Sequence, residues 1–60
     1  MPKLTKYEFK VCEAVQLGMD AYYMGTGDRR VLTQDDYETA YRILPTLPIG
    51  WMQEHQDWMR

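Results

Sequence analysis

The chain has few of the residues that carry chemistry: one cysteine and one histidine in 60 residues. A single cysteine excludes a disulfide within the chain. We therefore expect Cys12 to be a small buried apolar group in a reducing, cytoplasmic compartment, with a reactive thiol as the alternative. One cysteine and one histidine also fall short of the four ligands that structural zinc usually takes. The composition predicts no metal, no cofactor and no catalytic set of residues.

The sequence also lacks long apolar runs and an excess of positive charge. No apolar run approaches the roughly 18 residues that span a membrane, and the start shows no signal-peptide core. Residues 1–30 carry five basic and four acidic side chains, and residues 31–60 carry two and five. A duplex DNA binder normally shows a basic patch. We expect no membrane partner and keep nucleic acid only as an alternative.

Residues 5–24 predict the main helix. Thr5 and Glu8 have the spacing of a capping box, in which each residue hydrogen-bonds the other's backbone amide. Gly25 is a residue suited to the turn after a helix. At about 100° per residue, this helix is apolar over more than half its circumference. It therefore needs cover on more than one side, and we expect the chain to self-associate through this broad face.

A second and a third helix are predicted at 34–44 and 51–59. Thr33 and Asp36 repeat the capping-box spacing, and Pro45 ends the second helix. The glycine-containing stretch 25–31 reads as the turn between the first two helices. The fold class is therefore all-α: a helical hairpin with a short C-terminal helix, in one domain.

The stretch 46–50 directly follows Pro45 and holds Pro48 and Gly50, and these two prolines and the glycine exclude a helix through it. Leu47 and Ile49 are the apolar side chains of this rigid connection. We expect both of them to pack onto the helical hairpin.

Aromatic residues are the strongest functional signal. Eight of the 60 residues are aromatic, and five of these are tyrosines. Core filling explains some of them, but a short chain cannot bury all of them, and aromatic residues are enriched at protein interfaces. The residues that we predict to contact a partner are Leu17, Tyr22, Tyr23, Met24, Arg29, Arg30, Trp51, His55 and Trp58.

Three other patterns have a structural and a functional interpretation. The glycines near Arg29 and Arg30 could hold a phosphate, but no P-loop or dinucleotide motif is present, and a solvated turn is favoured. The acidic residues of 35–38 favour a helix start and could also imitate nucleic-acid phosphates. His55, between two tryptophans, is expected to be structural because no nucleophile accompanies it.

The sequence is most consistent with a non-enzymatic protein–protein interaction module that acts as a regulator, adaptor or inhibitor, and as a homodimer. By association, small acidic chains of this kind fit a phage or mobile-element origin. The alternatives are a structural component of an assembly, or a nucleic-acid-associated helical module. The latter would use Lys6, Lys10, Arg29 and Arg30.

Overall fold

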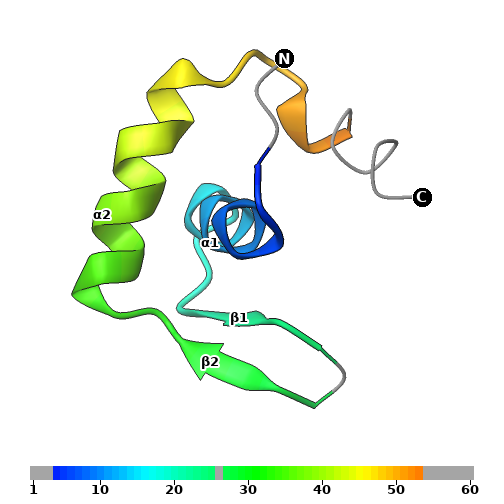
Figure 1. Ribbon diagram of the computed structural model, residues 1–60, viewed down its shortest axis with the longest axis vertical. Helices are drawn as coiled ribbons and strands as arrows, with labels where there is room; N and C mark the ends of the chain where they lie inside the picture. Colours follow the sequence, from blue (N-terminus) through cyan, green and yellow to red (C-terminus); the bar gives the residue numbers. More distant parts are fainter. Residues whose placement is uncertain (1–3, 26, 54–60) are drawn as a thin grey trace.

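The computed structural model describes residues 4–25 and 27–53. The elements are α1 (Lys6–Gln16), β1 (Ala21–Tyr23), β2 (Arg29–Val31), α2 (Gln34–Ile43) and the 3₁₀ helix η1 (Leu44–Thr46). Figure 1 shows α1 end-on in the centre, with α2 on one side, the β-hairpin below and the segment after η1 above. The chain is mostly helical and its two main helices pack together, as predicted, but it also carries a two-stranded β-hairpin, so the fold is not purely all-α.

The predicted start of α1 is confirmed. The Glu8 amide donates to Thr5 Oγ1 at 3.1 Å, and the Thr5 amide donates to Glu8 Oε1 at 2.9 Å. Both halves of the capping box are therefore made. Two amides that would lack a partner inside the helix are satisfied by its own first turn.

The predicted end of α1 is wrong: the helix ends at Gln16, not at residue 24. Gly18 adopts a φ of +73°, the left-handed conformation that glycine takes most easily. The Met19 amide donates to the Ala14 carbonyl at 2.8 Å and the Gly18 amide to the Val15 carbonyl at 3.2 Å. These two bonds form a Schellman motif. Gly18, read from the sequence as an interior helix residue, is therefore the stop.

The residues released from the helix form an antiparallel hairpin, with Tyr22 opposite Arg30 and Tyr23 opposite Arg29. Aromatic residues favour strands. Gly27, in the connection between the two strands, has a φ of +76°, the left-handed region in which hairpin connections often place glycine. The stretch 25–31, predicted as a turn between helices, is instead this connection and the strand β2.

The second helix is confirmed within one residue, as α2 followed by η1. The Asp36 amide donates to Thr33 Oγ1 at 3.3 Å, and the Thr33 amide donates to Asp36 Oδ2 at 3.0 Å. The other carboxylate oxygen, Oδ1, accepts a hydrogen bond from the Tyr7 hydroxyl of α1. The Asp36 side chain, which is one half of the capping box of α2, therefore also joins the two helices.

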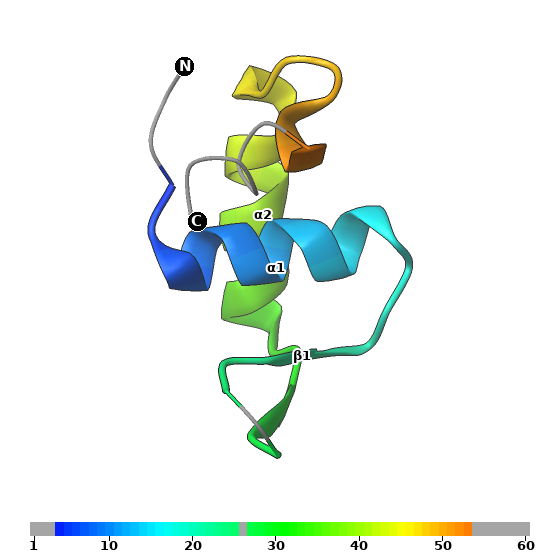
Figure 2. The same cartoon turned by 90° about the vertical axis from the view of Figure 1, so that its right-hand side faces the viewer.

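The core is built around α1. Figure 2 shows α1 crossing in front of α2, with the hairpin below it. The prediction that the first helix needs cover on more than one side is confirmed, because buried residues from β1, α2 and the last described segment surround it. The core cluster consists of Phe9, Val11, Cys12, Ala14, Tyr22, Leu32, Ala40 and Trp51.

The predicted third helix lies partly outside the described residues. Residues 51–53 are helical, and the remainder of 51–59 is not described. Within the described part of the chain, no helix is long and apolar enough to cross a bilayer.

Candidate functional site

The segment 43–53 has eleven consecutive residues without a charged side chain, in a chain where 27% of the residues are charged. It starts at the last residue of α2, runs through η1 and ends in the helical turn at residues 51–53. A surface segment is normally rich in charge. The exposed residues of this stretch therefore present no charge, and we call residues 43–53 the neutral segment.

A tight turn in the neutral segment separates a core residue from an exposed one. The Trp51 amide donates to the Pro48 carbonyl at 3.2 Å, and Gly50 has a φ of +84°. A positive φ at the third position is the mark of a type II turn. Ile49 occupies the second position, at the corner, and its relative exposure is 102%. The prediction that Ile49 packs onto the helices is wrong, because the turn directs it into solvent.

Trp51, two residues later, points the other way. It is 7% exposed and meets Phe9 of α1 edge to face, with ring centroids 5.6 Å apart and an interplanar angle of 81°. Such an arrangement is favoured between aromatic rings. Leu47 is half-buried against the same core, as predicted. Trp51 and Leu47 thus pack the neutral segment onto the core, and the exposed Ile49 lies between them in the chain.

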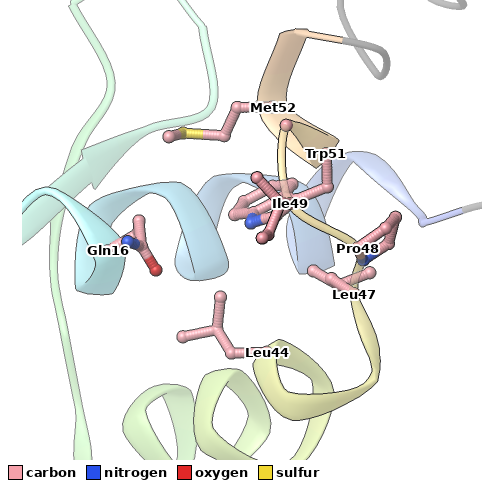
Figure 3. Close-up of a pocket in the computed structure, with 8 residues that line it drawn as sticks. Gln16, Leu44, Leu47, Pro48, Ile49, Trp51 and Met52 are labelled. Atoms are coloured by element: carbon pink, nitrogen blue, oxygen red, sulfur yellow. The ribbon is translucent and has the colours of Figure 1, made fainter.

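A cleft of about 320 Å³ opens beside this turn. Figure 3 shows Gln16 of α1 on one wall, Leu44 on another, and the side chains of the turn around the remainder. The described lining holds no ionisable side chain and one polar one, Gln16. The lining residues are Gln16, Leu44, Leu47, Pro48, Ile49, Gly50, Trp51 and Met52.

The arginines of the hairpin are paired within the chain. Arg29 lies 3.7 Å from Asp20, and Arg30 lies 3.2 Å from Asp28. The hydrogen bond and the charge of Asp28 raise the pKa of Arg30. Both pairs are solvent-exposed and therefore weak. A phosphate would nevertheless have to compete with a neighbouring carboxylate for each guanidinium.

The structure separates the other predicted contact residues. Tyr22 is buried and meets Tyr7 edge to face at 6.2 Å, and Met24 is half-buried against the core. Leu17 and Tyr23 are 59% and 47% exposed, at the end of α1 and in the hairpin. Among the predicted contact residues, only Trp51 is in the described lining of the cleft. His55 and Trp58 lie outside the described residues.

The prediction missed Ile49 as a candidate contact residue, although two features of the sequence point to it. One is the uncharged run of residues 43–53, and the other is the Pro-Ile-Gly order, which favours a turn with its middle residue at the corner. Apolar character alone indicated burial. Ile49 is recognised as exposed only if Gly50 is assigned a positive φ, which creates the turn that directs Ile49 into solvent.

Asp36 serves the fold, not the surface. Burial would raise its pKa, but hydrogen bonds from the Thr33 amide, the Tyr7 hydroxyl and the Thr33 side chain together hold the pKa below its usual value. The same Asp36 carboxylate raises the pKa of Tyr7. Because Asp36 is only 7% exposed, the acidic cluster at the start of α2 cannot present all its carboxylates to a partner.

Cys12 is fully buried, as expected, and burial raises the pKa of its thiol to about 11. A thiol in that environment stays protonated at neutral pH and is a poor nucleophile. Over residues 4–25 and 27–53, no three histidine, cysteine, aspartate or glutamate side chains come together as a metal site would require.

The chain was compared with known proteins in three ways. No protein-family model, no curated protein and no solved structure matches it. The cleft and the neutral segment are therefore the features from which a function can be inferred.

Proposed function

We propose that this protein is a non-enzymatic protein–protein interaction module, an adaptor, regulator or inhibitor, that binds its partner through the neutral segment and its cleft. The observation that carries the proposal is Ile49, fully exposed on a hydrogen-bonded turn beside a cleft whose side chains are mostly apolar. Covering an isoleucine side chain is worth about 1.5–3 kcal/mol. A partner that covers Ile49 gains this energy without having to order the turn first.

The chemistry of the described lining supports binding instead of catalysis at this place. Its polar side-chain groups are the amide of Gln16 and the indole N–H of Trp51, and the other lining side chains are aliphatic or thioether. A cleft of about 320 Å³ is at the lower end of the size range of binding pockets. Interfaces draw most of their energy from a few side chains that fill such hollows. The cleft therefore suits an apolar anchor residue of a protein partner.

Nucleic acid remains the alternative partner, and it would use a different surface. Its candidate residues include Arg29 and Arg30, each of which pairs with an aspartate in the chain. Binding through phosphates falls steeply with salt, whereas binding through an apolar cleft does not. Salt dependence therefore distinguishes the two functions.

The test is capture of partners from the source cell by the tagged protein, followed by mass spectrometry. Ile49→Glu places a charge at the cleft, and Val31→Glu places the same charge on the hairpin at a residue that is 60% exposed. We expect Ile49→Glu to lower the amount of captured partner at least ten-fold, and Val31→Glu to leave that amount unchanged. Loss with Val31→Glu alone, or loss on nuclease treatment, would overturn the proposal.

A further inference from the structure

We infer that the neutral segment is a self-complementary surface on which two copies of this chain pair, with Ile49 of each copy in the cleft of the other. This inference rests on the proposed function and names the partner of the same site. It does not use the broad face of α1, because α2, the hairpin and Trp51 already cover that face.

The protruding side chain, Ile49 (the knob), and the cleft that would receive it (the hole) lie side by side on one surface. Ile49 is fully exposed at the corner of the turn, and it also borders the cleft. In a two-fold dimer the same patch is used by both partners, so residue i of one copy meets residue j of the other and the reverse. A knob adjacent to its own hole satisfies this condition directly. The two contacts form together and close the assembly as a dimer, with no open chain of copies.

Charge favours this face for pairing like with like. The chain has a formal charge of −2, so two copies carry the same net charge and repel each other at long range. The neutral segment brings no charged side chain to a two-fold axis. The hairpin would be a poor choice, because two-fold pairing about Arg30 sets arginine against arginine, and like charges directly opposite are unfavourable.

The size of the surface makes the dimer a weak one. Stable interfaces use about 20–30 residues on each side. Eight described residues line this cleft. We therefore expect a dimer that forms at high micromolar concentration and dissociates on dilution, so that the surface is free for another protein at low concentration.

The test is disulfide trapping between two single variants of the full chain, Ile49→Cys and Gln16→Cys, mixed in equal amounts with copper phenanthroline as oxidant. Gln16 is exposed and lines the cleft, so the variant cysteine replaces no core residue. A disulfide requires the two Cα atoms to lie within about 7 Å. The native Cys12 is fully buried with a raised thiol pKa, and the wild-type chain measures its background.

We expect the 49–16 heterodimer to form at least five-fold faster than the product of a matched mixture of Val31→Cys with Gln16→Cys. Equal rates in the two mixtures would overturn the inference, as would a folded monomer in sedimentation equilibrium at millimolar concentration. Species larger than dimers would also overturn it, because they would show an open contact. If the chain is monomeric but Ile49→Glu still abolishes partner capture, the proposed function stands and only the self-pairing fails.

Discussion

The α1–α2 contact and the neutral segment cover two sides of the same helix with different chemistry. Across the first, the Tyr7 hydroxyl meets the buried Asp36 carboxylate, which also caps α2. Across the second, Trp51 meets Phe9 edge to face, and the neutral segment that holds Trp51 carries no charge. The polar contact fixes the geometry of two helices. The apolar one fixes a turn and leaves Ile49 in solvent, which the fold does not require.

The largest expected effect on stability comes from replacing the two apolar residues of the turn, Trp51 and Ile49, one at a time by alanine. Trp51→Ala should lower the free energy of unfolding by about 3 kcal/mol or more, since it removes a buried aromatic side chain. Ile49→Ala should change it by less than about 0.5 kcal/mol, as exposed substitutions do. Urea unfolding monitored by circular dichroism measures both. Similar losses for the two variants would show that Ile49 belongs to the core.

The turn itself depends on Gly50. Gly50→Ala should cost about 1–2 kcal/mol, because an alanine in the left-handed region strains the backbone at a φ of +84°. Gly25→Ala is the control, since Gly25 is not among the glycines with positive φ and both sites have open space for a methyl group. Thermal unfolding of the two variants gives the comparison. A Gly50→Ala protein as stable as Gly25→Ala would contradict the turn geometry.

The polar side of α1 is tested by removing one hydroxyl. Tyr7→Phe deletes the donor to Asp36 and should cost about 1 kcal/mol at pH 7, the ordinary worth of a hydrogen bond. Tyr41→Phe is the matched control, because Tyr41 is 62% exposed and its ring can still stack on Tyr37. Chemical denaturation should show no change for the control. An unchanged midpoint for both would mean that the Tyr7–Asp36 bond adds nothing to stability.

The smallest expected effect is the dependence on pH of the stability that the Tyr7–Asp36 hydrogen bond contributes. The folded chain holds the pKa of Asp36 below its usual value, so the carboxylate stabilises the fold above the unfolded pKa of about 3.9. This stabilisation is lost as pH falls from about 4 through the folded pKa. The difference in unfolding free energy between wild type and Tyr7→Phe should therefore shrink below pH 4. The corresponding difference for Tyr41→Phe should not change with pH. A difference for Tyr7→Phe that grows below pH 4 would contradict the lowered pKa of Asp36.

Interactions between residues close in the sequence could be predicted, and interactions between distant residues could not. Both capping boxes were predicted because the partners lie three residues apart, so the spacing alone defines the bonds. The hydrogen bond between Asp36 and α1 was not predicted, because its donor, Tyr7, is 29 residues away and no local sequence feature identifies Tyr7 as the donor.

The end of α1 shows why the middle of the chain was misread. Gly18 and Gly25 are both possible helix stops by composition. The Schellman bonds at Gly18 decide between them. They are favoured because β1 then places Tyr22 against Tyr7 in the core. A helix continued to residue 24 would have kept its own hydrogen bonds but lost the hairpin.

The candidate site was predicted only in part, for a similar reason. Trp51 was identified because tryptophan is enriched at interfaces, although it is 7% exposed and reaches the surface only as a wall of the cleft. Ile49 was assigned to the core on its apolar character. Which of the two apolar residues Ile49 and Trp51 faces inward depends on the turn between them, and the partner of the inward one, Phe9, lies more than 40 positions earlier.

The central claim is that the neutral segment is the contact surface of this protein. The most direct test is a dilution series of the ¹⁵N-labelled chain, from millimolar to about ten micromolar, followed by two-dimensional NMR. The account predicts concentration-dependent amide shifts at Gln16 and in residues 44–52, with the hairpin unchanged. Shifts centred on Tyr23 and Arg29, or a spectrum that is the same at every concentration, would contradict it.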